Sequence, residues 1–197
     1  MMSEAIKIVI YGSFATGKTT LVERFKKDTF DNAVESTIGA AFYAITLPLP
    51  NGGSIKAQIW DTAGMEKFKS IVPMYLRGAT IVIFCFDSPK LDIIREGIRF
   101  IRTATDAKIV LVQTKIDIYR ANIINEDLTM QLNLFLERGE YKIFYTSAKT
   151  GHSVKELFDY CIIKGNEIKN ASFVQEQRLE IKNDIVENSK YGCCVIN

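Results

Sequence analysis

The stretch Gly-Ser-Phe-Ala-Thr-Gly-Lys-Thr at residues 12–19 decides the fold of this chain. Two glycines separated by four residues and followed by Lys and Thr fit the phosphate-binding loop pattern. The apolar run Ile6–Tyr11 before it predicts a buried strand, and residues 20–25 after it predict the start of an amphipathic helix. A strand, a glycine-rich turn and a helix direct backbone N–H groups and a helix N-terminus at one anion. The sequence therefore predicts a site for a nucleoside di- or triphosphate.

Two side chains in this loop have predicted roles. We expect Lys18 to reach the outer phosphates and the hydroxyl of Thr19 to ligate Mg²⁺. The alternative is a plain glycine turn between a strand and a helix. The flanking strand and helix patterns, together with the later motifs, favour the phosphate site.

The rest of the chain alternates between strand and helix patterns. Apolar runs predict strands at residues 41–47, 55–60, 81–86, 109–112 and 142–145, and helical spacing covers residues 94–101 and 128–136. Residues 50–53, Pro-Asn-Gly-Gly, predict a hairpin turn, and residues 65–77 read as a polar, mobile segment. Ser153 and Glu156 form a capping-box pattern at the start of a last helix. About six strands and five helices predict a doubly wound, mostly parallel α/β sheet with its ligand site at the C-terminal strand ends.

Composition limits the function classes. A chain of 197 residues suits one α/β domain, predicted over residues 1–170, followed by a flexible tail over residues 171–197 where apolar periodicity fades. The net charge of +2 argues neither for nor against nucleic acid, and there is no long basic stripe. We expect no nucleic-acid partner. We expect no signal peptide and no apolar run of the ~18 residues that a membrane helix needs. Cys85 and Cys161 lie in apolar segments, which favours a reducing cytosol.

Three further strings predict which nucleotide binds. Asp61-Thr62-Ala63-Gly64 offers a carboxylate to the Mg²⁺ shell, through water, and a glycine N–H to the γ-phosphate. Asp117 can accept hydrogen bonds from N1–H and the exocyclic amine of guanine, and adenine offers neither in that geometry. Lys115 would pack its stem over the base, and the Ala148 N–H would bond the guanine carbonyl. Each string alone could be an ordinary turn or loop, but together and in this order they predict a guanine nucleotide, GTP or GDP.

With these motifs the chain resembles the Ras superfamily of small GTPases, and within it the Rab family. The resemblance covers about residues 6–165 and the C-terminus. Residues 35–42 and 73–79 are most similar to the early-endosomal Rab subfamily. By resemblance, Thr37 ligates Mg²⁺ and senses the γ-phosphate, Phe30 packs against guanine, and Phe42, Trp60 and Tyr75 face effectors. The expected nucleotide-binding residues are Ser13, Phe14, Ala15, Thr16, Gly17, Lys18, Thr19, Thr20, Phe30, Thr37, Gly64, Thr114, Lys115, Asp117, Ser147, Ala148 and Lys149.

The C-terminus resembles a Rab double-prenylation signal. Cys193 and Cys194 are adjacent near the end of the chain, and two lipid chains give stable anchoring where one gives marginal binding. The resemblance implies effectors, an exchange factor and a GDP-dissociation inhibitor as partners. It also implies a location on the cytoplasmic face of endomembranes, endosomal or vesicular, with a cytosolic pool.

Two departures from the family concern catalysis, for which the expected residues are Lys18, Thr37, Gly64 and position 65. The family has a glutamine that orients the attacking water where this chain has Met65, whose thioether cannot hold a water in line. Phe14 replaces a glycine or small residue and would crowd the γ-phosphate and any arginine finger. We therefore expect slow hydrolysis, unless other residues compensate. A GTP-bound scaffold that does not cycle is the alternative, and a P-loop kinase is a third reading that the guanine motifs disfavour.

The third departure is Thr114, where the family has asparagine. Threonine can still bond nearby backbone, but it lacks the carboxamide that reaches the base and ties down the phosphate loop. Losing one hydrogen bond costs roughly 0.5–1.5 kcal/mol. The sequence therefore predicts weaker nucleotide binding and faster release, with guanine selectivity kept by Asp117.

Overall fold

A six-stranded sheet forms the centre of the protein. The computed structural model describes residues 5–31, 33, 35–48, 53–64, 70–88, 90–119, 134–139 and 141–191. The strands are β1 (Ile6–Gly12), β2 (Ala40–Pro48), β3 (Ser54–Thr62), β4 (Ile81–Phe86), β5 (Lys108–Gln113) and β6 (Lys142–Tyr145). Their order is β2-β3-β1-β4-β5-β6, with β2 antiparallel to β3 and the other neighbouring pairs parallel. The predicted mostly parallel α/β sheet is confirmed.

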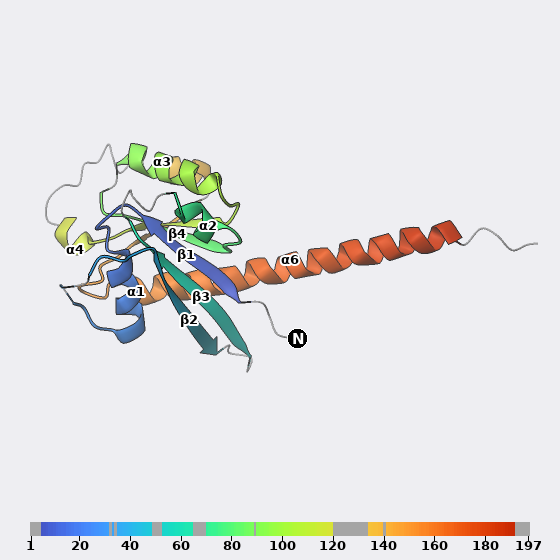
Figure 1. Ribbon diagram of the computed structural model, residues 1–197, viewed down its shortest axis with the longest axis horizontal. Helices are drawn as coiled ribbons and strands as arrows, with labels where there is room; N and C mark the ends of the chain where they lie inside the picture. Colours follow the sequence, from blue (N-terminus) through green and yellow to red (C-terminus); the bar gives the residue numbers. More distant parts are fainter. Residues whose placement is uncertain are drawn as a thin grey trace, which may run out of the picture.

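Helices cover both faces of this sheet. They are α1 (Lys18–Lys27), α2 (Val72–Leu76), α3 (Leu91–Arg102), α4 (Ile116–Tyr119) and α6 (Val154–Tyr191), and residues 134–139 are also helical. Figure 1 shows α3 over one face and α1 with the first part of α6 over the other. In the described part of the chain, none of the helices combines the length and the apolar character needed to cross a membrane.

The period of two residues along each strand divides the core between the two faces. On β1, Ile8 and Ile10 pack with α1 and α6, whereas Val9 packs with α2 and α3. Every residue of β4 is buried because both of its faces are covered. On α6, Gly165 permits a close approach, since a Cβ there would lie 2.4 Å from Cγ2 of Ile6.

The structure differs from the sequence expectations in two helical regions. The expected flexible tail from residue 171 is helical to Tyr191, and Figure 1 shows this part of α6 projecting away from the sheet. A segment rich in Glu, Gln, Lys and Arg, without proline or glycine, favours helix through the intrinsic propensities of its residues. The boundary near residue 170 stays a prediction. The second difference is α2, which forms a helix inside the segment expected to be polar and mobile.

The capping box predicted at residues 153–156 is wrong in detail. The helix does begin at Val154, but Ser153 has φ 50°, whereas a capping-box serine adopts an extended conformation. A backbone bond from the Leu157 N–H to the Ser153 carbonyl, 3.2 Å long, starts the helix instead. Residues 49–52 of the hairpin turn and residues 128–133 of the predicted helix lie outside the described residues.

Candidate nucleotide-binding site

A cavity of about 520 Å³ opens at the C-terminal ends of the parallel strands. Fourteen of the seventeen predicted nucleotide-binding residues line it: Phe14, Ala15, Gly17, Lys18, Thr19, Thr20, Phe30, Thr37, Gly64, Thr114, Lys115, Asp117, Ala148 and Lys149. The cavity lining does not include Ser13, Thr16 and Ser147, which lie behind it and hydrogen-bond to lining residues or to one another. Six lining residues were missed: Leu21, Asp31, Glu35, Ser36, Thr62 and Ile118. Each of the six is within two residues of a predicted one in the sequence, and including such neighbours would have predicted them.

The loop between β1 and α1 has the backbone form that its glycines allow. Gly17 has φ 80° and Ala15 has φ 59°, both in the left-handed region. At Gly12 a Cβ would lie 2.2 Å from the carbonyl oxygen of Cys85, so only glycine fits between β1 and β4. The loop therefore turns sharply and places the N-terminus of α1 at the cavity.

Lys18 is the cation of this loop. Its side chain is buried, and Nζ donates to the carbonyl oxygens of Gly12 (2.9 Å) and Ser13 (2.8 Å). Burial lowers the pKa of Lys18, because a low-dielectric surrounding penalises the ammonium form. An anion in the cavity would offset that penalty, so this position suits a phosphate.

Thr19, Thr37 and Asp61 meet at the side of the cavity next to Lys18. The Thr19 hydroxyl lies 2.6 Å from Oδ2 of Asp61 and 2.8 Å from the Thr37 hydroxyl. Asp61 is fully buried, and its Oδ1 has no hydrogen-bond partner among the described residues. Burial is the main cause that raises the pKa of Asp61 to about 6, against the lowering effect of the Thr19 hydrogen bond. Two hydroxyls beside a buried carboxylate with one unpartnered oxygen fit the oxygen preference of Mg²⁺.

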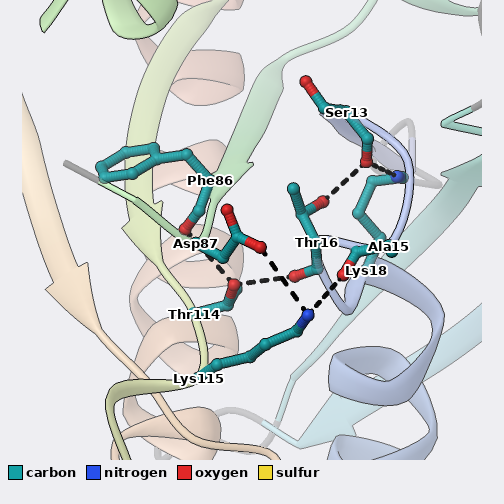
Figure 2. A network of polar contacts seen from close by, with 8 residues as sticks. All are labelled: Ser13, Ala15, Thr16, Lys18, Phe86, Asp87, Thr114 and Lys115. Atoms are coloured by element: carbon teal, nitrogen blue, oxygen red, sulfur yellow. Dashed lines mark hydrogen bonds and ion pairs between the residues drawn. The ribbon is translucent and has the colours of Figure 1, made fainter. Parts of the chain in front are cut away.

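Thr114 corrects one sequence expectation. Its hydroxyl lies 2.7 Å from the carbonyl oxygen of Thr16 and 3.3 Å from that of Phe86, so threonine does tie down the phosphate loop (Figure 2). The expectation that this tie is lost was wrong, because Thr114, a residue that is 3% exposed, reaches the loop backbone directly with its hydroxyl. Nearby, Lys115 donates to the carbonyl oxygen of Ala15 at 2.6 Å and lies 3.7 Å from a carboxylate oxygen of Asp87.

Asp117 lines the cavity from the first turn of α4, after β5. The Ser147 hydroxyl donates to Oδ1 of Asp117 at 2.6 Å, which holds the carboxylate in one orientation. The Thr150 N–H in turn donates to Oγ of Ser147 at 3.2 Å. Ala148 and Lys149 complete this end of the lining. A fixed carboxylate facing a cavity can accept two hydrogen bonds from a planar base.

Of the two residues that depart from the family at catalytic positions, the structure describes Phe14 but not Met65. Phe14 lines the cavity and is 51% exposed, so its ring lies at the entrance to the phosphate end. Gly64 packs against the same loop, since a Cβ there would lie 2.8 Å from the Phe14 backbone nitrogen. Met65 lies outside the described residues.

The three aromatic residues expected to face effectors form one cluster. The Phe42 and Trp60 rings lie 5.0 Å apart, and the Trp60 and Tyr75 rings lie 5.7 Å apart. They come from β2, β3 and α2, and Phe42 is 49% exposed. Their role toward effectors stays a prediction. Cys193 and Cys194 lie outside the described residues.

This sheet order, with a phosphate-binding loop after β1 and a carboxylate-bearing loop after β5, defines the class of P-loop nucleotide-binding proteins with a doubly wound sheet. The sequence profile of the Ras family matches residues 7–166. The chain belongs to the Ras family, and its relatives carry Rab and Ypt names. It is therefore a small GTPase that binds GTP and GDP.

Three relatives give the scale of the similarity. The GTP-binding protein ypt5 of Schizosaccharomyces pombe is 39% identical over 157 residues, which cover 77% of this chain and 74% of that protein. The Ras-related protein Rab-5A of Dictyostelium discoideum is 36% identical, and the Ras-related protein RABF2a of Arabidopsis thaliana is 34% identical. Each of these two alignments covers 77% of this chain and 76% of the relative.

Proposed function

We propose that this small GTPase is a Rab-type switch of vesicle traffic, acting on the endocytic route. The observation that carries the proposal is the single cavity that joins a phosphate-binding loop, the Thr37 segment and the Asp117 loop. Such a cavity lets a γ-phosphate hold the segments around Thr37 and Gly64 in place, and its loss releases them. The relatives named Rab-5A and ypt5 support the endocytic assignment.

The same proposal places Mg²⁺ beside the phosphates. Thr19 and Thr37 would ligate the ion directly, and Asp61 would hold it through water. The unpartnered Oδ1 of Asp61 supports this assignment, because a buried carboxylate oxygen needs a proton donor or a cation. When bound, the ion neutralises charge that develops on the phosphates.

Asp61→Asn tests the metal assignment. The variant should bind nucleotide more weakly, and chelation of Mg²⁺ should then have little further effect on nucleotide release. Without metal, the free energy of unfolding of the variant at pH 7 should exceed that of wild type by about 1–3 kcal/mol, because the variant no longer buries a charge. Since the folded-state pKa of Asp61 is raised to about 6, the carboxylate destabilises the metal-free protein above that pH. The stability difference should therefore shrink as the pH falls from 7 through 6 towards 4.

The control for this experiment is Asp106→Asn, which changes an exposed carboxylate in the loop before β5. It should alter neither the chelator dependence nor the stability. Chelation that releases nucleotide equally fast from wild type and Asp61→Asn would contradict the metal assignment.

We further propose that hydrolysis is slow. Met65 cannot orient an attacking water, and the Phe14 ring at the cavity entrance narrows the approach of an arginine finger. Arginine-finger stimulation is worth about 10³–10⁵ in rate, so a partner that cannot insert one would leave a long-lived GTP state.

Met65→Gln should raise the single-turnover rate of GTP hydrolysis by about tenfold or more, because the carboxamide can hold the water in line. Met74→Gln is the matched control, since Met74 is 64% exposed on α2 and the same exchange there should leave the rate unchanged. Equal and fast hydrolysis by wild type and Met65→Gln would contradict slow turnover. Mass spectrometry of the co-purified nucleotide gives an independent readout. Slow hydrolysis should leave GTP bound to the purified protein, whereas fast hydrolysis should leave GDP.

Membrane attachment is proposed to occur through prenyl groups on Cys193 and Cys194. Effectors would bind over the Phe42–Trp60–Tyr75 cluster, and an exchange factor and a GDP-dissociation inhibitor would control the nucleotide and the membrane cycle.

Changing both terminal cysteines to serine should move the protein entirely from the membrane fraction to the cytosol, and either single change should give partial loss. Two chains are needed for stable anchoring, whereas one gives reversible binding. Fractionation of cells expressing each variant measures this, with Cys161→Ser, a buried position on α6, as a control for loss of a thiol. A double variant that stays on membranes would contradict the assignment.

A further inference from the structure

The Thr114 side chain at the end of β5 is buried in the wall of the cavity, between its base end and the phosphate loop. Its hydroxyl has one proton, and the 2.7 Å contact to the carbonyl oxygen of Thr16 requires that proton as the donor. The second contact, 3.3 Å to the Phe86 carbonyl oxygen, competes for the same proton (Figure 2). Both acceptors are backbone atoms of the protein, so the hydroxyl has no proton left for a ligand.

Thr114 therefore presents to the cavity a methyl group and an oxygen that can only accept. The neighbouring cation, Nζ of Lys115, is directed at protein acceptors: it donates one of its three N–H groups to the Ala15 carbonyl oxygen at 2.6 Å and lies 3.7 Å from a carboxylate oxygen of Asp87. A ligand atom that is itself an acceptor finds no donor in the Thr114 side chain.

Guanine has such an acceptor on this edge. This step rests on the proposed orientation, in which Asp117 accepts from N1–H and the exocyclic amine and the Ala148 N–H donates to O6. The next polar atom around the ring after O6 is N7, and it accepts hydrogen bonds only. Thr114 lies between the Asp117 loop and the phosphate loop, since its hydroxyl bonds Thr16, and N7 would face it.

We propose that Thr114 makes this site indifferent to N7 of the purine. The side chain holds the phosphate loop in place but contributes no hydrogen bond to the base at that edge. Recognition of guanine then depends on the N1, amine and O6 positions. Guanine nucleotides that lack the N7 acceptor bind as tightly as GDP, or somewhat more tightly, because a buried N7 without a donor gives up its hydrogen bond to water.

The test compares GDP with 7-deaza-GDP, in which a C–H group replaces N7, in equilibrium competition against a fluorescent guanine nucleotide. Wild type should bind both compounds with affinities equal within about twofold. Thr114→Asn supplies an amide donor and should prefer GDP by about fivefold. Thr114→Ser keeps the hydroxyl and should keep the wild-type ratio of the two affinities, whatever it does to each affinity. A purely structural role for Thr114 would change the affinity for both nucleotides together and leave their ratio unchanged in the Asn variant.

Wild-type protein that prefers GDP by fivefold or more overturns the inference, and this outcome does not depend on whether any variant folds. An Asn variant with no preference for GDP also overturns it. Failure of the proposed orientation of the base has a different signature, because an excess of ADP would then displace the fluorescent nucleotide from wild type as GDP does.

Discussion

Lys18→Ala should lower the affinity for GDP and GTP by about a hundredfold or more. Lys18 is 6% exposed, and it lines the cavity beside the phosphate-binding loop. Removing one partner of a buried, hydrogen-bonded charge pair costs about 2–5 kcal/mol, and each 1.4 kcal/mol is tenfold in affinity. The variant also removes the Lys18 donor from the carbonyl oxygens of Gly12 and Ser13, of which the Ser13 oxygen keeps the Thr16 hydroxyl as a donor. Titration with a fluorescent guanine nucleotide measures the affinity.

The matched control is Lys155→Ala on α6, a lysine whose side chain is 79% exposed and pairs with Asp159. Because exposed ion pairs contribute little, this change should leave nucleotide affinity at the wild-type value. Thermal unfolding of both variants shows whether each is folded, so that a loss of affinity can be assigned to the binding site and not to unfolding. Lys18→Ala protein that is folded and still binds GDP like wild type would contradict the role assigned to this lysine.

Gly64→Ala should abolish the GTP-dependent function while sparing GDP binding. A Cβ at this position would lie 2.4 Å from Nζ of Lys18 and 2.6 Å from the Ser13 carbonyl oxygen. The backbone must therefore move away from the phosphate loop, and with it the N–H expected to approach the γ-phosphate. Loss of one preorganised donor of this kind costs about 10²–10³ in rate. Single-turnover hydrolysis of bound GTP and effector binding should both fall, whereas GDP has no γ-phosphate and should bind as before.

Gly78→Ala is the control for introducing a methyl group at a glycine. A Cβ at Gly78 would meet nothing within 4 Å, although its φ of +69° makes alanine strained there. It should reduce stability by about 1 kcal/mol without changing hydrolysis. Hydrolysis by Gly64→Ala at the wild-type rate would show that Gly64 need not lie against Lys18 during the reaction.

The sequence by itself determined those features that depend on local pattern. Residues 12–19 predict the loop, because the glycine spacing reports backbone conformations that other residues adopt at a cost. Buried strands such as Ile81–Phe86 are visible because strands covered on both faces are continuously apolar. The motifs at Asp61 and Asp117 predict one site, since the C-terminal ends of parallel strands share one edge of the sheet.

Only the tertiary structure decided which partner each polar group has. Thr114 and Thr16 are 98 residues apart, so the sequence predicted at most a bond from the threonine to nearby backbone and could not reveal that its hydroxyl bonds the phosphate loop. The unpartnered oxygen of Asp61 and the tight contact of Gly64 with Lys18 also depend on segments that are distant in sequence. The physical reason is that hydrogen-bond partners and steric room are properties of neighbours in space, whereas sequence patterns report backbone conformation and the side of an element that is buried.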